Sequence, residues 1–359
     1  MSDSRSILVT GAGGSAGHNV CWSLRMSKDS RTTLLTGIDS DRTSLQLNLW
    51  IDTAYHLPGA DRRNYLQALN KVVEKEHVEI VFPQPDPEVR RVSAERENLH
   101  AKIFLPDQKT VSNCLDKFEA LTIWHEAGLR RQPAVLSATD TAVNRRIKSL
   151  EYPCWIRARE GAGGLLSCKA TDSSIVDYWL RFHWDQGIKT DFVAEEYLPG
   201  RDYCFMSIWN HGSLVTSMIR ERLSWVGHRL IGTGGTSKLN RVVHQASVNN
   251  KALDAIRAIS KSPHGIFCVD LKENPDNIPC PTEINCRFTT NVHYLTLASM
   301  KLAHPEWNFV WLASRIALGE EIPDCSKTNA LPADLWFTKN TDMGFTVVSG
   351  NHWKAVEPS

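Results

Sequence analysis

The stretch CVDLKENPDNIPCPTEINCRF, residues 268–288, contains two strand-like runs joined by a polar turn, with Asp270 at the end of the first run. Alternate positions of the second run hold Glu283, Asn285 and Arg287. Because successive side chains of a strand point to opposite faces, these three residues are expected on one face of a sheet. Carboxylate and amide oxygens suit Mg²⁺, which usually completes its coordination shell with phosphate oxygens and water. The stretch therefore predicts a magnesium site, although ordinary polar alternation on a solvent-facing strand would give the same pattern.

The N-terminal part of the chain, up to residue 110, alternates strand-like and helical patterns. Strand-like runs lie at residues 7–10, 34–38, 79–82 and 103–105, and helical patterns lie at residues 64–76 and 87–99. Strands and helices that alternate at this spacing are typical of a parallel sheet. The pattern changes near Val111, where a domain boundary is expected.

A glycine-rich turn follows the first of these strands. The sequence ILVTGAGGSAG, residues 7–17, carries four glycines between the strand and a helix, and Asp39 closes the second strand. This arrangement is close to a dinucleotide fingerprint, in which amides at a helix N-terminus meet a pyrophosphate and an acid meets the ribose. A tight strand-to-helix turn also needs glycine for steric reasons, and none of the seven tyrosines has a lysine four places on. An NAD-dependent oxidoreductase or epimerase is therefore kept as the alternative function.

The chain after Val111 has a mixed pattern. Helical patterns lie at residues 116–127, 175–181, 249–260 and 307–317, and strand-like runs lie at residues 266–271 and 280–284. Short apolar runs, separated by glycines or other turn residues, occupy residues 153–170 and 192–215. This part is expected to form lobes that combine helices and strands.

Three further stretches, taken in order with residues 268–288, resemble the ATP-grasp enzymes, as found in the carbamoyl phosphate synthase large subunit, biotin carboxylase and D-alanine:D-alanine ligase. LDKFEALTIWHEAGL, residues 115–129, resembles the helix that opens the ATP-grasp region. WIRAREGAGG, residues 155–164, resembles the strand and flexible glycine loop that cover the triphosphate. VAEEYLPGRDY, residues 193–203, resembles the hinge beneath the adenine. The resemblance extends over residues 7–317.

The resemblance implies an α/β protein with an ATP-grasp fold, in which two α+β lobes hold ATP. The expected segments are a Rossmann-like parallel-sheet domain at residues 1–110, a small lobe at 111–190, a large lobe with the metal site at 191–320 and a C-terminal tail at 321–359. The Rossmann-like domain fits the family, whose members carry a parallel-sheet domain before the two lobes. The glycine loop at residues 11–17 would then border the substrate cleft and not ATP.

The resemblance also implies which residues meet the phosphates of ATP. Lys117 and Arg157 are expected near the phosphates, with Gly163 and Gly164 in the covering loop. Arg157 lies where many members have lysine. The guanidinium keeps the charge but replaces a compact ammonium with a planar fork, so that the two are not equivalent in geometry.

The hinge at residues 193–203 is expected to bind the nucleoside. By resemblance, Glu195 and Glu196 lie at or beside the position that contacts the adenine amino group, and the backbone of Leu198 pairs with the ring. Asp202 matches the acid that accepts the ribose hydroxyls. The chemistry agrees, because a ribose diol needs a carboxylate acceptor and an adenine needs apolar faces.

In the same family pattern Asp270, Glu283 and Asn285 hold Mg²⁺, and Arg157 and Arg287 are the catalytic cations. ATP would convert a carboxylate into an acyl phosphate, which an amine, with an amino acid as the expected partner, then attacks. ADP and phosphate would be released. Phosphoryl transfer depends on metal ions and fixed cations, so no catalytic Ser, Cys or His is expected. The chain is thus predicted to be an ATP- and magnesium-dependent carboxylate–amine ligase.

Other interpretations concern the same residues. A catalytically idle nucleotide-binding protein is a third possibility, but such a protein would have little reason to retain the complete metal set. Full carbamoyl phosphate synthesis needs two such modules, and this chain holds one. Residues 219–238 match no known motif. Their Arg220, Arg222 and glycines 232–235 could hold a substrate carboxylate or shape a lid, or could form a basic surface loop.

Composition restricts the partners of the chain. The 359 residues include 41 basic and 40 acidic side chains, and the net charge of +1 favours neither nucleic acid nor an anionic membrane. The sequence shows no signal-peptide pattern and no apolar run that approaches a membrane span. Nine cysteines without a C-x-x-C pair indicate reduced thiols. A cytoplasmic protein with small-molecule substrates is expected, and a homodimer is compatible with these features.

Overall fold

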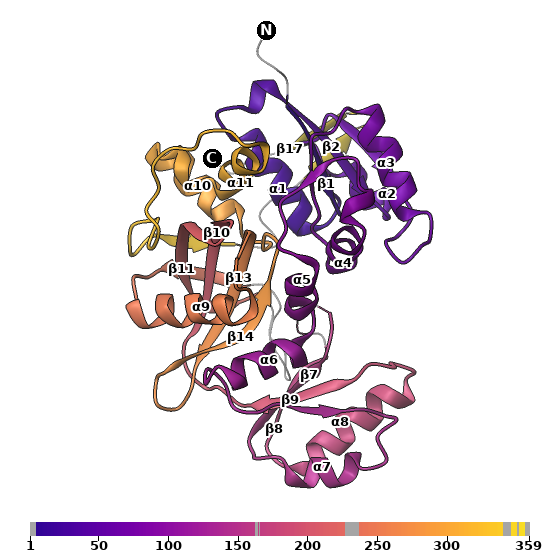
Figure 1. Ribbon diagram of the computed structural model, residues 1–359, viewed down its shortest axis with the longest axis vertical. Helices are drawn as coiled ribbons and strands as arrows, with labels where there is room; N and C mark the ends of the chain where they lie inside the picture. Colours follow the sequence, from indigo (N-terminus) through magenta and orange to yellow (C-terminus); the bar gives the residue numbers. More distant parts are fainter. Residues whose placement is uncertain are drawn as a thin grey trace.

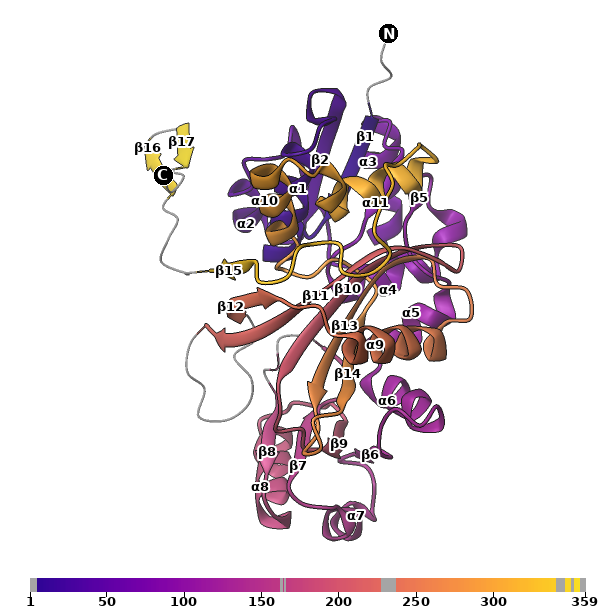
Figure 2. The same cartoon turned by 90° about the vertical axis from the view of Figure 1, so that its left-hand side faces the viewer.

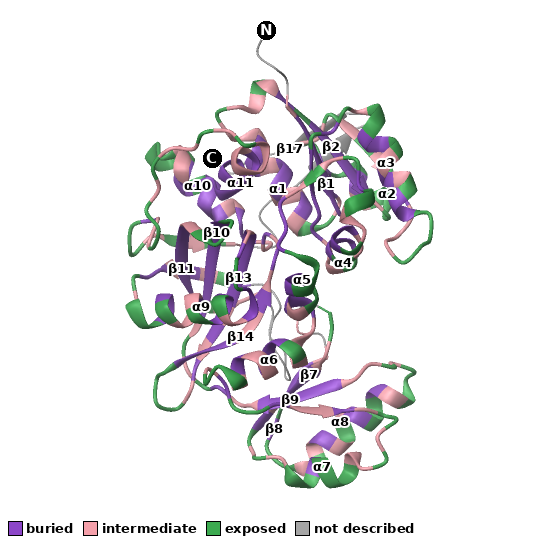
Figure 3. Cartoon of the chain, in the orientation of Figure 1, coloured by how far each residue is buried: buried purple, intermediate pink, exposed green. Residues whose placement is uncertain are grey.

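The computed structural model describes residues 5–161, 164, 166–226 and 237–339, together with the backbone of two short strands at 346–349 and 352–355. Its three larger sheets form three bodies, which are stacked along the long axis in Figure 1. The N-terminal sheet lies at one end, a six-stranded sheet lies in the middle, and a small four-stranded sheet lies at the other end. Buried residues concentrate in these sheets and on the helix faces that cover them (Figure 3).

The N-terminal sheet is fully parallel, with the strand order β3-β2-β1-β4-β5. Its strands are β1 (Arg5–Thr10), β2 (Thr33–Asp39), β3 (Thr53–His56), β4 (Ile80–Phe82) and β5 (Lys102–Ile103). Its helices are α1 (Ser15–Arg25), α2 (Arg42–Gln46), α3 (Tyr65–Lys75) and α4 (Asp86–Ala94). The predicted parallel α/β arrangement is confirmed.

Two helices lead from this sheet to the small lobe. They are α5 (Gln108–Leu115) and α6 (Lys117–Glu126), and each begins after an aspartate that caps its first turn. Asp116 accepts hydrogen bonds from the amides of Phe118 and Glu119, at 3.0 and 3.2 Å. Such caps satisfy amides that have no partner within the helix. The cap at Asp116 fixes the position of Lys117, the first residue of α6.

The small lobe is an antiparallel sheet with the order β6-β9-β7-β8, covered by two helices. The strands are β6 (Ala134–Leu136), β7 (Cys154–Ala158), β8 (Cys168–Ala170) and β9 (Phe192–Glu196), and the helices are α7 (Val143–Ser149) and α8 (Ser173–Asp185). β9 pairs with both β6 and β7. β9 ends at Glu196, so the boundary predicted after residue 190 would separate this strand from the rest of its sheet.

The six-stranded sheet is antiparallel, with the order β14-β13-β10-β11-β12-β15. Its strands are β10 (Asp202–Asn210), β11 (Ser213–Trp225), β12 (Ser237–Val242), β13 (Gly265–Glu273), β14 (Pro279–Asn285) and β15 (Trp336–Thr338). β13 continues to Glu273, so Asp270 lies within the strand and not at its end. β15 pairs with β12, so part of the segment predicted as a tail belongs to this sheet.

The two faces of the six-stranded sheet are covered by different elements. One face packs on α5, α6 and α9 (Ala246–Ile259). The other face shares a core with β1, α1, α10 (His293–Leu302) and α11 (Phe309–Leu318). Buried hydrogen bonds reinforce this second contact, because Thr296 donates to the Ser23 hydroxyl and Asn308 donates to its carbonyl, both at 2.8 Å. The N-terminal domain and the large lobe are therefore joined through one continuous core.

Figure 2 shows the β13–β14 hairpin reaching towards the small lobe. No helix in the described part of the chain is both long and apolar enough to cross a bilayer. All nine cysteines are free thiols, and eight of them are buried.

Candidate active site

A cavity of about 870 Å³ lies between the small sheet and the six-stranded sheet. Every predicted site residue that the structure describes lines this cavity: Lys117, Arg157, Gly164, Glu195, Glu196, Leu198, Asp202, Asp270, Glu283, Asn285 and Arg287. Gly163 lies outside the described residues. Segments that are far apart in the sequence thus meet at one hollow, which has the size of a small-molecule site.

The predicted metal ligands come from the β13–β14 hairpin. Asp270 lies opposite Glu283 in the strand register, and Asn285 donates to the Glu283 carboxylate at 3.4 Å. Carboxylate and amide oxygens of this kind suit Mg²⁺. Within the described ranges, no group of three or more His, Cys, Asp and Glu side chains is placed to hold a metal ion. A magnesium site here would depend on the Asn285 amide and on oxygens from a bound substrate.

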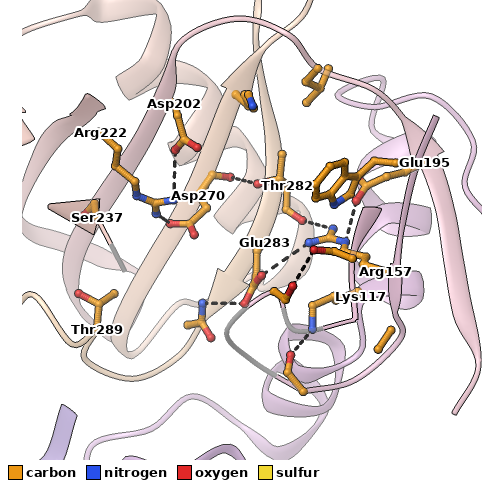
Figure 4. A pocket seen from close by; sticks show the side chains of 18 of the residues that line it. Lys117, Arg157, Glu195, Asp202, Arg222, Ser237, Asp270, Thr282, Glu283 and Thr289 are labelled. Carbon is orange, nitrogen blue, oxygen red and sulfur yellow. Dashed lines mark hydrogen bonds and ion pairs between the residues drawn. The ribbon is translucent and has the colours of Figure 1, made fainter. Parts of the chain in front are cut away.

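Arg222 of β11 lies between two of the predicted acids (Figure 4). Its Nη1 is 3.1 Å from Asp202 Oδ1, and its Nη2 contacts Asp270. Burial raises the pKa of Asp202, and Arg222 opposes that shift. The predicted ribose acid and the predicted metal ligand therefore share one cation. A metal ion at Asp270 would compete with Arg222 for the carboxylate.

Arg157 and Lys117 lie on the side of the cavity towards the small lobe (Figure 4). Arg157 Nε is 2.6 Å from Glu195 Oε1, and its Nη1 is 3.6 Å from Glu283 Oε2. Arg157 therefore links β7 of the small sheet with β14 of the large sheet. Lys117 donates to the carbonyl of Gly161. Burial lowers the pKa of Lys117, while the nearby Glu283 carboxylate opposes the shift.

The two hinge glutamates bind two arginines that no motif in the sequence indicates. Arg130 Nη2 is 2.8 Å from Glu195 Oε2, and its Nη1 is 3.3 Å from Glu196 Oε1. Arg131 reaches the other oxygen of Glu196 at 3.0 Å. Glu195 thus lies between Arg130 and Arg157, and its side chain is only 3% exposed. Its carboxylate positions Arg157.

Flat and apolar side chains form the wall of the cavity beside the hinge. Trp155, Tyr197, Leu198 and Leu166 line it there, and the rings of Trp155 and Tyr197 lie 6.4 Å apart. The turn after Leu198 contains Gly200, where a Cβ would lie 2.5 Å from Glu273. Only glycine allows this close approach, in which the Gly200 amide donates to the Glu273 carbonyl at the end of β13.

Arg287 lies just after β14 and is held by the N-terminal domain. Its Nε is 2.6 Å from Oδ1 of Asp86, the first residue of α4. Burial acts to lower the pKa of Arg287, yet the Asp86 carboxylate keeps this pKa above its usual value. No local pattern in the sequence indicates this partner, because Asp86 and Arg287 are 201 positions apart.

The glycine loop at residues 11–17 is explained by packing. A Cβ on Gly13 would lie 2.7 Å from the Leu45 amide nitrogen, and a Cβ on Gly17 would lie 2.2 Å from the Gly11 carbonyl oxygen. The Gly13 amide donates to Asp39 at 2.9 Å, so the two groups predicted for pyrophosphate and ribose bind each other. Among the residues that line the 870 Å³ cavity, none comes from this loop.

Comparisons with known proteins support the fold. No protein-family model matches the sequence, and no curated protein matches it. Among solved structures, L-amino acid ligase from Bacillus licheniformis superimposes with a TM-score of 0.67 at 14% identity, over 89% of this chain and 75% of that one. Carboxyaminoimidazole ribonucleotide synthase from Aspergillus clavatus, complexed with ATP, gives 0.68 at 15% identity, over 94% and 81%.

A third structure is similar over the same range. The biotin carboxylase domain dimer of Hydrogenobacter thermophilus 2-oxoglutarate carboxylase, in complex with MgADP, ADP and bicarbonate, gives a TM-score of 0.66 at 15% identity, over 92% of this chain and 73% of that one. Identities this low establish the fold alone. The chain has the ATP-grasp fold, as predicted.

Proposed function

We propose that the chain is a carboxylate–amine ligase that uses ATP and Mg²⁺, forms an acyl phosphate and releases ADP and phosphate. One observation carries this proposal. The cavity between the two lobes brings the acids Asp270 and Glu283 together with the cations Lys117, Arg157 and Arg287. Fixed cations and metal-binding acids around one hollow are what phosphoryl transfer to a carboxylate requires.

The nucleotide is proposed to lie with its adenine beside the hinge and its phosphates towards Arg157, Lys117 and the loop at 163–164. Leu198 offers backbone groups and an apolar surface there, and Glu196 lies at the edge of the same wall. The ribose is assigned to Asp202. Similar structures crystallised with ATP, ADP or MgADP support the choice of ATP.

The donor set fits Mg²⁺, with Asp270, Glu283 and Asn285 as the proposed ligands. When bound, the ion would neutralise charge on the transferring phosphoryl group. Arg157 of β7 and Arg287, just after β14, add positive charge from the small lobe and the large lobe. Because Arg222 contacts both Asp202 and Asp270, an ion at Asp270 would leave Arg222 paired with Asp202 alone or free to meet a phosphate oxygen.

The reaction balances without a protein nucleophile. A substrate carboxylate oxygen attacks the γ-phosphorus of ATP, ADP leaves, and an acyl phosphate forms. The amine nitrogen then attacks the acyl carbon, the carbon–oxygen bond to phosphate breaks, and phosphate leaves with the proton that the nitrogen loses. We propose an amino acid as the amine, a choice that the similar L-amino acid ligase structure supports. The oxidoreductase alternative is disfavoured, because Asp39 and the Gly13 amide bind each other.

We also propose a cellular compartment and an oligomeric state for the enzyme. Nine free thiols favour a reducing compartment, and we place the enzyme in the cytoplasm. Its partners are small molecules. A homodimer is part of the proposal, because one similar structure is a dimer, and light scattering on the purified chain would test it.

The deciding experiment measures ADP release with Mg-ATP against a panel of carboxylic acids combined with amines, and identifies the nucleotide product by chromatography. ADP and phosphate that form only when both an acid and an amine are present would support the proposal. AMP and pyrophosphate would indicate adenylation and would contradict the acyl-phosphate route.

A further inference from the structure

One arginine in the cavity wall differs from the others. Arg220 of β11 lines the cavity and is only 3% exposed. The other three arginines that line the cavity, Arg157, Arg222 and Arg287, each pair with at least one carboxylate. Arg220 forms no ion pair with any residue that the structure describes. A buried cation without an anionic partner is costly, so it is a candidate for binding an anionic ligand.

A buried hydrogen-bond network holds Arg220 in place. Its Nη1 donates to the Ser237 hydroxyl at 3.0 Å and to the Asn240 amide oxygen. Ser237 in turn donates to the same Asn240 oxygen at 2.8 Å, which uses the only proton of the hydroxyl. Asn291 therefore has to meet Ser237 with its amide nitrogen, as it does at 3.1 Å. The network fixes the amide orientation of Asn291 through donor and acceptor chemistry.

The fixed orientation leaves an acceptor without a partner. Asn291 lines the cavity and is 3% exposed, and its Oδ1 is buried with no hydrogen-bond partner in the described structure. Buried acceptors of this kind are normally satisfied. The wall around Ser237 thus combines a guanidinium that has no carboxylate partner among the described residues with an acceptor that has no hydrogen-bond donor there. Arg220 and Asn291 together match a ligand that has both an anionic group and an N–H group.

This part of the cavity lies away from the proposed phosphate site. In Figure 4, Ser237 and Thr289 lie on one side of Asp270 and Glu283, whereas Lys117 and Arg157 lie on the other. Burial lowers the pKa of His293 to about 4, and Lys339 and Arg220 contribute to that lowering. A ligand here would face the metal-binding acids from the side opposite to Lys117 and Arg157, the residues proposed to meet the phosphates.

We infer that Arg220 and Asn291 form the subsite for an α-amino acid that serves as the amine substrate. Arg220 binds its carboxylate, which does not react, and Asn291 Oδ1 accepts an N–H of its amino group. The amino nitrogen would then face Asp270 and Glu283. The acyl phosphate is proposed to form between these two acids and Arg157. This inference rests on the proposed ligase function for the identity of the reaction, but the binding of an amino acid by Arg220 can be tested separately.

The test compares each common L-amino acid with its primary amide, which keeps the amine and side chain but lacks the carboxylate charge. Thermal stabilisation of the full chain is measured with Mg²⁺ and a non-hydrolysable ATP analogue, since a specific ligand stabilises the folded state by mass action. We expect one or more amino acids to bind at least about a hundredfold more tightly than their amides, because loss of one partner of a buried charge pair is costly.

Variants test whether Arg220 is responsible for the preference for the free acid over the amide. Arg220→Met is expected to remove the preference for the free acid, and Arg220→Lys is expected to weaken it while keeping the charge. Arg241→Met is the matched control, because Arg241 lies on the neighbouring strand β12 and pairs with Glu221. The control should keep the preference. If Arg220→Met fails to fold, the wild-type comparison and Arg220→Lys still decide the question.

The outcomes separate the subsite from the ligase reaction. Equal binding of acids and amides, no binding of any amino acid, or an unchanged preference in Arg220→Met would each overturn the subsite. Amino-acid binding through Arg220 without ADP release from any acid would support the subsite and contradict the ligase. ADP release with simple amines as efficient as with amino acids would support the ligase and overturn the subsite.

Discussion

Replacement of Glu283 by glutamine should abolish most activity and leave the fold intact. The substitution removes the charge of one proposed metal ligand and keeps the size of the side chain. Loss of one preorganised electrostatic contact typically costs about 3 kcal/mol of transition-state stabilisation, or about a hundredfold in kcat. Glu283 lies at the hairpin that carries both other proposed ligands, so its loss affects the whole set.

The effect on stability should be much smaller, for reasons that the structure provides. Glu283 lies 3.6 Å from Arg157 and its side chain is 27% exposed. Arg157 keeps its shorter contact with Glu195, at 2.6 Å, in the variant. A long and partly exposed ion pair contributes at most about 1 kcal/mol to the free energy of unfolding. Activity and stability should therefore separate clearly in this variant.

The assay is ADP release at saturating Mg-ATP, together with urea unfolding followed by circular dichroism. Asp276→Asn is the matched control, because it removes the same charge from the exposed turn of the same hairpin. The control should keep wild-type kcat. Near wild-type turnover in Glu283→Gln, or an equal loss in Asp276→Asn, would show that the metal site lies elsewhere.

Three further results are expected. Asp202→Ala should raise the KM for ATP more than it lowers kcat, because a ribose contact is made equally in the ground and transition states; a fall in kcat alone would contradict the hinge assignment. Burial raises the pKa of Glu88 to about 7. Between pH 4.5 and 7 this carboxyl ionises in the unfolded state but stays protonated in the folded state, so the free energy of unfolding should fall by about 3 kcal/mol as the pH rises. In urea unfolding, Glu88→Gln should remove this pH-dependent loss of stability. An unchanged pH dependence in the variant would refute the assignment to Glu88. Mg-ATP should raise the Tm, whereas NAD and NADP should not; a shift with NAD that Gly13→Leu abolishes would favour the oxidoreductase.

Local patterns in the sequence predicted the strands and the residues that share a face. Alternation along residues 283–287 placed three polar side chains on one surface, and all three line the cavity. The sequence predicts a strand at residues 266–271 with Asp270 near its end, yet β13 continues to Glu273. The strand continues because Glu273 is buried against Arg201 and Tyr203, with Glu273 accepting from both side chains. Burial of a charged residue depends on partners that are distant in sequence.

Pairings between distant segments could not be predicted in the same way. Arg130 follows a helix in a turn, and nothing nearby in the sequence indicates that its side chain is fully buried against Glu195. The pairing of Arg287 with Asp86 depends on how the N-terminal domain packs on the large lobe. The glycine loop at 11–17 was ambiguous for a related reason. Its glycines avoid contacts with α2 and with its own backbone, and those contacts exist only in the folded chain.

The ion pairs around the cavity distinguish arginines that support the structure from the arginine that is proposed to bind a ligand. Arg157 links the small lobe to the large lobe, and Arg287 links the large lobe to the N-terminal domain. Arg222 links β11 to β10 and β13. Each of these cations is compensated by protein carboxylates before any ligand binds, whereas Arg220 has only neutral partners among the described residues. Because a buried charge needs an anion nearby, the position that lacks one indicates where a substrate carboxylate would contribute most to binding.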